Sequence, residues 1–178
     1  METGKWYSIE HMLTSEQYEA VGRLAVAFND IEFMIEVYIA NVLDTPEWKQ
    51  SVFLAEREFG FAKKRTLLKN LLEIAEAEYP LLKPHIETVN LLLSKAAEIA
   101  SKRNEHVHGL AVTDNISKEV VRRYKGIEKP CDADAIKALA SEASKLAEQL
   151  NLACLEVVMR LVRARDLKRA ESDDADSP

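Results

Sequence analysis

The sequence predicts an all-α protein, an up-and-down bundle of four main helices with one short extra helix. A small irregular or hairpin segment is expected after the helix that begins near Pro84. Composition is the first reason, because the 178 residues include only five glycines and five prolines, a scarcity typical of helical proteins. Periodicity is the second, because apolar residues recur at three- and four-residue steps in the long segments. We expect a single domain over residues 1–169, which is long enough to bury a substantial core.

The first helix is predicted to start at Thr14, because the run Thr-Ser-Glu-Gln has the sequence of a capping box with Gln17 at its third helical position. Residues 1–13 contain apolar side chains that would dock on the body without forming an element. One acid, Glu32, lies beside the apolar seam; it either reaches solvent or serves as the counter-charge of a buried arginine or orients a histidine. The seam consists of Val21, Leu24, Phe28, Ile31, Ile35, Tyr38 and Val42.

Two further helices are expected before residue 80. A short one covers residues 47–58 and ends at Gly60, and a longer one runs from Phe61 to Tyr79. The start of the longer helix is basic, which we interpret as a solvated face. Its predicted buried face is Leu67, Leu68, Leu71, Leu72, Ile74 and Ala75. Tyr79-Pro80 then marks the turn into the next helix, because a residue before proline leaves the helical region.

The helix that begins near Pro84 carries a charge inside its apolar stripe. Three- and four-residue steps from Ile86 pass through four further apolar residues to Ala100, then reach Arg103 and return to an apolar residue at Val107. Burying a guanidinium costs several kcal/mol unless a carboxylate or phosphate partner is present. The stripe therefore predicts that Arg103 has a specific partner.

Polar residues cluster where this helix is expected to end. Asn104 and His108 are four residues apart and share a helix face. Arg103 and His108 are five apart, about 140° around an ideal helix, so they converge only if the helix ends or distorts between them. Gly109 suits the left-handed residue that terminates a helix.

The pattern changes after Gly109. Residues 110–125 include turn residues and a β-branched stretch, which indicate an irregular segment or a small hairpin. We assign basic residues in and beside this segment as candidate substrate-binding groups, namely Lys102, Arg122, Arg123 and Lys125. Asp132 is expected to cap a last helix that runs to about Asp166. Its face is rich in small residues: Ile136, Ala140, Ala143, Ala147, Leu150, Cys154, Val157 and Leu161.

Charge and hydropathy limit the function classes. The net charge of −6 falls to −2 when the four acids of residues 170–178 are left out, and we expect that segment to be a disordered acidic tail. The nearly neutral body argues against tight nonspecific nucleic-acid binding but leaves room for a local basic patch. No run of eighteen apolar residues and no apolar signal core are present, so we expect a cytoplasmic protein without a membrane partner. Cys131 and Cys154 lack metal or redox spacing and are expected to be free thiols.

We expect no metal and no cofactor. His106 and His108 could form half of a metal site, but the other histidines and acids supply no complementary ligand spacing. No nucleophile elbow, phosphate-binding loop or dinucleotide fingerprint is present. Neither cysteine has a neighbour that would activate it.

The stretch Arg103-Asn104-Glu105-His106-Val107-His108, at the end of a long helix in a helical chain, resembles the R-x4-6-H motif of the HEPN superfamily. The order of helices from about Ser15 to Arg165 is similar to that family as well. The resemblance implies a dimer that brings two motifs together, and a metal-independent endoribonuclease activity that many members have, often as toxins or defence components. Arg103 and His108 match the defining positions, and Asn104 matches the polar residue that often follows the arginine. Where some members have an acid directly before the histidine, this chain has Val107.

The residue types suit RNA cleavage by themselves. Metal-free cleavage requires a base for the 2′-hydroxyl proton and an acid for the leaving 5′-oxygen, and histidine can serve as either near neutral pH. An arginine can stabilise the charge that develops on the phosphate. We therefore assign Arg103, Asn104, His108 and Glu32 as the candidate catalytic group.

The sequence thus favours a HEPN-like homodimer that cleaves RNA, as the toxin or effector of a prokaryotic defence or toxin–antitoxin pair with an antitoxin or regulatory partner. The alternatives are a noncatalytic module in which the same polar residues staple the bundle or bind a nucleotide, and an adaptor that only binds a partner protein. The homodimer is also predicted from apolar positions beside the motif helix in excess of one core: Leu91, Leu92 and Ile99.

Overall fold

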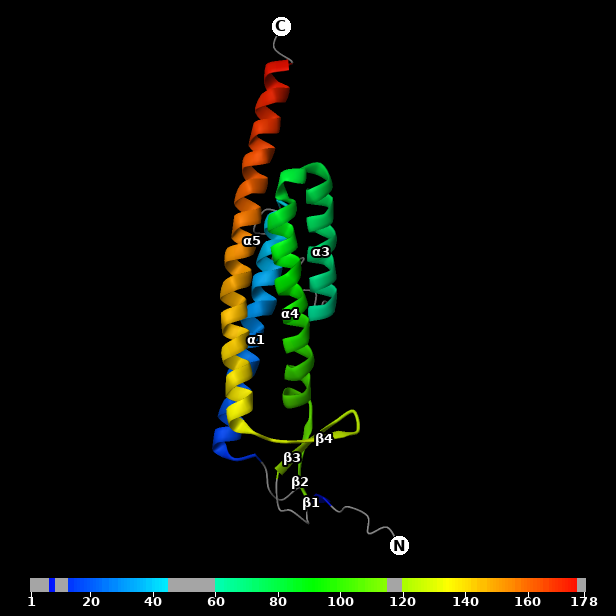
Figure 1. Cartoon of the computed structure of the whole chain (residues 1–178), viewed down its shortest axis with the longest axis vertical. Helices are drawn as coiled ribbons and strands as arrows, with labels where there is room; N and C mark the ends of the chain where they lie inside the picture. The colour runs from blue at the N-terminus through cyan, green and yellow to red at the C-terminus, as the bar shows by residue number, and fades with distance from the viewer. Residues whose placement is uncertain (1–6, 9–12, 45–59, 115–119, 176–178) are drawn as a thin grey trace. The chain divides into compact units, whose positions relative to one another are not determined.

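The chain forms two compact units. A computed structural model describes residues 7–8, 13–44, 60–114 and 120–175 (Figure 1). The first unit, called the motif unit here, contains residues 1–30 and 97–145. The second, called the helical unit, contains residues 31–96 and 146–178. Three of the helices contribute one part to each unit, so the units are described one after the other.

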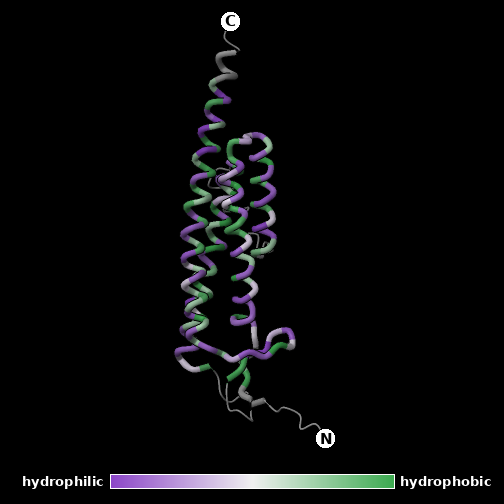
Figure 2. The backbone as a smooth tube through the Cα atoms, viewed as in Figure 1, coloured by the Kyte–Doolittle hydropathy of each residue, from purple (hydrophilic) through white to green (hydrophobic). Residues whose placement is uncertain are grey.

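The chain is mostly helical, as predicted. Its helices are α1 (Ser15–Val42), α3 (Phe61–Glu78), α4 (Lys83–Val107) and α5 (Ala133–Ala175), with the short 3-10 helix η1 (Pro80–Leu82) between α3 and α4. Apolar and polar residues alternate along each long helix (Figure 2), which is the pattern of helices that bury one face. The short helix expected over residues 47–58 lies outside the described residues.

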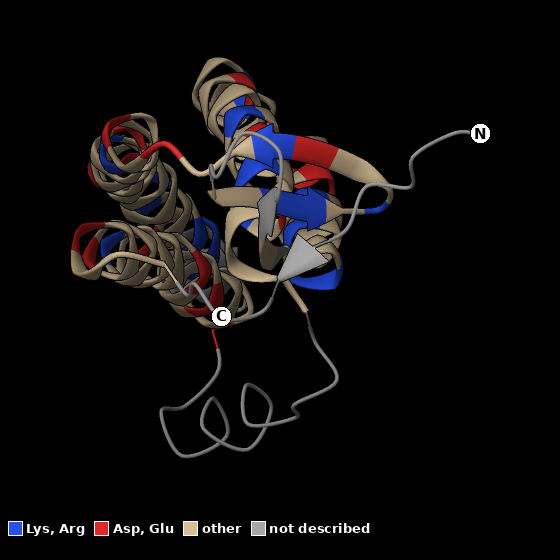
Figure 3. Ribbon diagram, turned by 90° about the horizontal axis from the view of Figure 1, so that it is seen from below, with Lys and Arg blue, Asp and Glu red and all other residues tan. Residues whose placement is uncertain are grey.

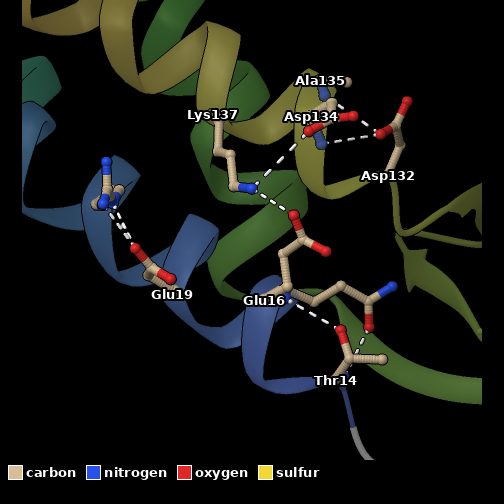
Figure 4. A network of polar contacts seen from close by, with 9 residues as sticks. Thr14, Glu16, Glu19, Asp132, Asp134, Ala135 and Lys137 are labelled. Carbon is tan, nitrogen blue, oxygen red and sulfur yellow. Dashed lines mark hydrogen bonds and ion pairs between the residues drawn. The ribbon is translucent and has the colours of Figure 1, made fainter.

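Two predicted helix caps are present in the motif unit (Figure 4). The amide of Thr14 donates to Oε1 of Gln17 at 2.9 Å, and the amide of Gln17 donates to Oγ1 of Thr14 at 3.2 Å. This is the reciprocal bonding of a capping box. Asp132 caps α5, because its Oδ1 accepts the amides of Asp134 and Ala135 at 2.9 and 3.3 Å. Both starts satisfy amide groups that a helix leaves without internal partners.

The first turns of α1 and α5 are joined inside the motif unit. Nζ of Lys137 lies 2.5 Å from a carboxylate oxygen of Glu16 and 3.8 Å from one of Asp134 (Figure 4). The amide nitrogen of the Gln17 side chain donates to the carbonyl of Cys131 at 2.6 Å. The apolar core of this unit includes Leu24, Phe28, Ile99, Val112, Ile136 and Ala143.

The segment after α4 is a β-sheet, larger than the small hairpin that the sequence predicted. Strands β1 (Tyr7–Ser8), β2 (Leu110–Asp114), β3 (Val120–Tyr124) and β4 (Ile127–Pro130) form an antiparallel sheet in this order. Lys125 and Gly126 connect β3 to β4 with positive φ angles of 50° and 81°, as a two-residue hairpin turn requires. The expectation that residues 1–13 form no element is wrong, because Tyr7 and Ser8 pair with the edge of β2. Two residues are too few to show a strand periodicity in the sequence.

In the helical unit, α3 leads through η1 back into α4 (Figure 1). Leu68, Leu72 and Ala75 form the buried face of α3, as predicted, but Ile74 is 64% exposed and was assigned to that face wrongly. Ile74 directly precedes the buried Ala75 and therefore points about 100° away from it on a helix. The basic start of α3 is also not simply solvated, because Lys64 is 13% exposed and forms an ion pair with Glu36.

Helix α5 has the predicted buried face, since all eight positions from Ile136 to Leu161 in that stripe are buried. In the helical unit it is anchored by polar contacts. The hydroxyl of Tyr38 lies 2.7 Å from Oδ1 of Asn151, and Arg165 donates to the carbonyl of Val42 at 2.8 Å. The helix ends at Ala175 rather than near Asp166, so it includes most of the segment expected to be a disordered tail.

Of the three apolar positions that suggested a homodimer, only Leu91 is exposed, at 58%. Leu92 and Ile99 are buried at 7% and 1% exposure and belong to the core, so that part of the prediction is wrong. Within the described part of the chain, no helix has the length and apolar content needed to cross a membrane.

Candidate functional site

The end of α4 brings the three motif residues together in the motif unit. Nη1 of Arg103 lies 3.1 Å from Oδ1 of Asn104 and 3.3 Å from Nε2 of His108. The helix ends at Val107, and His108 is held in a last turn by its amide bond to the carbonyl of Asn104 at 3.1 Å. The prediction that Arg103 and His108 meet because the helix ends between them is confirmed.

Arg103 is half-buried, with its Cζ 5.3 Å from the centroid of the Phe28 ring. Phe28 is 1% exposed, so the guanidinium of Arg103 lies against a core residue. Its Nε atom is buried and makes no hydrogen bond to any described residue. Among the residues that the structure describes, no carboxylate forms an ion pair with Arg103. A fixed guanidinium without an acidic partner is suited to bind an anion.

The nature of the contact between Arg103 and His108 depends on the tautomer of the imidazole. A guanidinium has only donors, so Nε2 of His108 accepts a hydrogen bond from it only when Nε2 carries no proton. His108 is exposed, so an incoming phosphate can engage Arg103 and leave the Nε2 lone pair available to accept a proton.

In the structure, the ionic partner of Glu32 is a lysine and not Arg103. A carboxylate oxygen of Glu32 lies 4.0 Å from Nζ of Lys64, which also pairs with Glu36, and all three residues belong to the helical unit. Glu32 therefore has an ionic partner on α3, a contact that the heptad-like pattern of α1 alone did not reveal. The lysine was visible in the sequence only as one of several basic residues at the start of α3.

A glycine is needed at position 109 because a larger residue would not fit there, not because the backbone is left-handed. Its φ angle is not positive, so the expectation that it terminates α4 in the left-handed region is wrong. A Cβ atom at this position would lie 2.3 Å from the carbonyl oxygen of Glu105. The close approach lets the chain pass directly from the last turn of α4 into β2.

Arg122 has a different role from the one that we expected. It is 6% exposed and is the one buried charged residue among those described. Nη1 donates to the carbonyls of His106 and, at 3.2 Å, of Gly109, and Nε lies 3.4 Å from Sγ of Cys131. A positive charge at the carboxyl end of a helix is favourable, because the last carbonyls have no helical partners. Arg122 thus fixes the helix end that carries His108, and its Nε and Nη1 donors are used within the protein.

The other candidate substrate-binding residues are accessible. Lys102 is exposed near the end of α4, and Arg123 is 51% exposed with its Nε 4.0 Å from a carboxylate oxygen of Glu128. Lys125 is exposed in the hairpin turn, with Nζ 5.2 Å from the centroid of the Tyr124 ring. Basic residues are visible on the strands when the molecule is viewed from below (Figure 3).

His106 lies at the same helix end but belongs to another environment than His108. Burial lowers the pKa of His106, and the positive charge of Arg122 lowers it further, while Glu105 acts in the opposite direction. Its Nδ1 is buried and has no hydrogen-bond partner among the described residues. Burial and the charge of Arg122 both favour the neutral form of the His106 ring. Sequence reasoning did not identify it as a functional residue, because only the sheet gives it this environment.

Comparison with known protein families, curated proteins and solved structures found no match for this chain. In the parts of the chain that the structure describes, no three His, Cys, Asp or Glu side chains are grouped as metal ligands.

Proposed function

We propose that the protein is a metal-independent endoribonuclease of the HEPN type, with Arg103 and His108 as its catalytic residues. The observation that carries the proposal is the 3.3 Å contact between Nη1 of Arg103 and Nε2 of His108 at an exposed helix end, with no acidic partner for the arginine among the described residues. This pair places a positive charge beside a ring nitrogen of an exposed imidazole.

Each residue has a defined step in the proposed reaction. Arg103 binds the nonbridging oxygens of the scissile phosphate, and Oδ1 of Asn104, 3.1 Å from Nη1, keeps the guanidinium plane in place. Nε2 of His108 takes the proton of the 2′-hydroxyl, and the 2′-oxygen attacks phosphorus. The bond from phosphorus to the 5′-oxygen breaks, which leaves a 2′,3′-cyclic phosphate on one product. The 5′-oxygen takes a proton and becomes the hydroxyl of the other product.

The leaving 5′-oxygen needs an acid in addition to the base. In a homodimer, the second copy of His108 would be this acid. An exposed apolar stripe on α5 supports self-association. Its members are Leu152, Leu155, Met159 and Val162, each at least 46% exposed and spaced by three and four residues. This is the spacing of the seam between two packed helices. Two motifs in one assembly would provide a base, an acid and two arginines.

The biological role that we propose is that of a toxin or effector in a prokaryotic defence or toxin–antitoxin system. Support comes from the likeness of the motif to HEPN toxins and from an activity that would damage cellular RNA. Induced expression of the parent should stop growth, whereas His108→Ala should not. Normal growth with abundant folded parent protein would remove the toxin role.

The chemistry itself is tested by cleavage of single-stranded RNA with purified variants. His108→Ala and Arg103→Ala should each lower the rate by about two orders of magnitude or more, the scale of acid–base and charge-stabilising contributions. His85→Ala is the matched control, because it makes the same change at the other end of α4. Equal rates for the parent, His108→Ala and His85→Ala would rule out His108 as a catalytic residue.

A noncatalytic helical module that binds a nucleotide or a partner protein is the second candidate. The contact of Arg103 with the buried ring of Phe28 favours it, because such packing stabilises a fold without any reaction. Under this alternative, Arg103→Ala would lower the free energy of unfolding and the parent would leave every RNA intact.

A further inference from the structure

A second feature of the motif unit is a small pocket between the last turns of α4 and the β3–β4 hairpin. Its volume is about 150 Å³, and a cavity of about this size holds one benzene-sized ring. It is therefore large enough for a single flat heterocycle and too small for most drug-sized ligands. The residues that line it are Ser101, Glu105, His106, Arg122, Tyr124, Lys125, Ile127 and Lys129.

The walls of the pocket combine an aromatic surface with groups that bind polar edges. Tyr124 offers a half-exposed ring, and Ile127 is 60% exposed beside it. At His106, Nδ1 is closed off from solvent, so Nε2 is the nitrogen left to meet a ligand. Burial and the charge of Arg122 lower the pKa of His106, which favours the neutral form of the ring. A neutral imidazole offers one directional hydrogen bond to a ligand without requiring a charged ligand.

The charges around the pocket are mainly positive. Arg122, Lys125 and Lys129 stand against one carboxylate, Glu105, whose Oε2 lies 2.5 Å from Nζ of Lys129. Lys125 is exposed in the turn between the strands and can meet a phosphate at the rim. A flat heterocycle with an attached phosphate, that is, a nucleotide unit, matches both the interior and the rim.

The pocket and the motif share one support. Arg122 lines the pocket and donates to the carbonyls of His106 and Gly109, which flank His108 in the chain. The pocket and His108 therefore belong to the same helix end. A strand of RNA that crosses this helix end could contact both the pocket and the motif residues.

We propose that this pocket binds the base of one nucleotide next to the scissile phosphate and makes the enzyme selective for that base. Tyr124 stacks on the base, His106 and Glu105 bind its polar edge, and Lys125 binds the adjoining phosphate. The proposal rests on the proposed ribonuclease function and adds to it the position and the residues of a specificity site.

Binding to the His108→Ala variant tests the pocket without cleavage. Short fluorescein-labelled homopolymers of each RNA base are titrated and followed by anisotropy. One base should bind at least about tenfold more tightly than the others, the order of one stacked and hydrogen-bonded base. Ser101→Phe fills the pocket from an exposed position on α4 and should abolish this preference. Ser94→Phe is the matched control, an exposed serine earlier on the same helix, and should preserve it.

Two further variants separate stacking from charge. Tyr124→Leu should lose the base preference, while Tyr18→Leu, at a tyrosine on α1 in the same unit, should retain it. Lys125→Ala should weaken all four homopolymers alike and lower the salt dependence of binding, because a phosphate contact carries no base information. Circular dichroism melts verify that each variant is folded.

The outcomes distinguish this proposal from the ribonuclease itself. Equal binding of all four homopolymers, or a preference that survives Ser101→Phe, would overturn the specificity pocket even if the parent cleaves RNA. A preference that Ser101→Phe removes would support the pocket even if the parent cleaves nothing. Binding of free nucleoside monophosphates without any binding of the homopolymers would overturn the assignment of the pocket to an RNA strand.

Discussion

At the scale of single residues, the helix end that carries His108 depends on two neighbours that take no part in the proposed reaction. Gly109 allows the backbone to pass the carbonyl of Glu105, and Arg122 binds the carbonyls of His106 and Gly109. Both residues act on the position of His108 rather than on the reaction. Their substitution should therefore change stability first.

Substitution of Gly109 by alanine should destabilise the protein. The added Cβ would lie 2.3 Å from a backbone oxygen, so the helix end or β2 must shift, at a cost of about 1–3 kcal/mol. Gly22→Ala is the control, since its Cβ would meet nothing within 4 Å and alanine favours a helix by up to about 1 kcal/mol. Urea unfolding should show opposite signs for the two changes, and equal shifts would contradict the close approach at Gly109.

Substitution of Arg122 by methionine should lower the free energy of unfolding by roughly 2–4 kcal/mol, because two carbonyls lose a charged donor. Arg123→Met removes the same charge from a side chain that is 51% exposed, and it should cost no more than about 0.5 kcal/mol. Chemical denaturation compares the two variants directly. A smaller cost at Arg122 than at Arg123 would mean that Arg122 does not hold the end of α4.

At the scale of elements, the sequence predicted features that depend on residues near one another in the chain. The capping box at Thr14, the cap at Asp132 and the buried stripe of α5 follow local rules, and all three are confirmed. The convergence of Arg103 and His108 is also local, because it needs only the helix to end.

Features that depend on distant partners could not be predicted in the same way. The strand at Tyr7 exists because β2 offers it an edge, and Arg122 is buried because the sheet folds against the end of α4. Glu32 meets Lys64 on another helix. Periodicity shows which face of an element is apolar, but it does not show which element will lie against that face.

Acid should weaken the packing of the sheet against α4 through His106. Its pKa is lowered by burial and by Arg122, so below the ordinary value of about 6.5 the unfolded chain binds a proton more readily than the folded one. Stability contributed in this way is fully present above that value and is lost as the pH falls from it through the lowered pKa of the folded protein. Urea midpoints of the parent should fall between about pH 7.5 and pH 5.5, and His106→Gln should fall less. Parallel pH dependences of the two proteins would show that His106 is not the group responsible.

At the scale of the whole molecule, the motif cluster belongs to one unit and the exposed stripe of α5 to the other. In the proposed enzyme, the motif would supply the chemistry, and self-association through the stripe would supply a second copy of it. Neither unit alone accounts for a base and an acid in one reaction.

Placing charge on the stripe should therefore prevent dimerisation. Leu155→Glu combined with Met159→Glu puts two carboxylates on positions that are 47% and 49% exposed, which the monomer tolerates and a helix seam does not. Light scattering should give a dimer for the parent and a monomer for the double variant, with ribonuclease activity lost in parallel. Leu81→Glu, at a leucine outside this stripe that is 90% exposed, should remain dimeric. A parent that is monomeric at tens of micromolar would remove the composite site.

The most direct test of the central claim is the chemistry of the products. The purified parent is incubated with single-stranded RNA in excess EDTA, and the ends of the fragments are identified by mass spectrometry. The proposed roles of His108 and Arg103 predict 2′,3′-cyclic phosphate and 5′-hydroxyl ends, resistance of RNA with a 2′-O-methyl group at the cut site, and no cleavage of DNA. Cleavage of the 2′-O-methyl RNA or of DNA, or 5′-phosphate ends, would show that the 2′-oxygen is not the nucleophile and would contradict the mechanism.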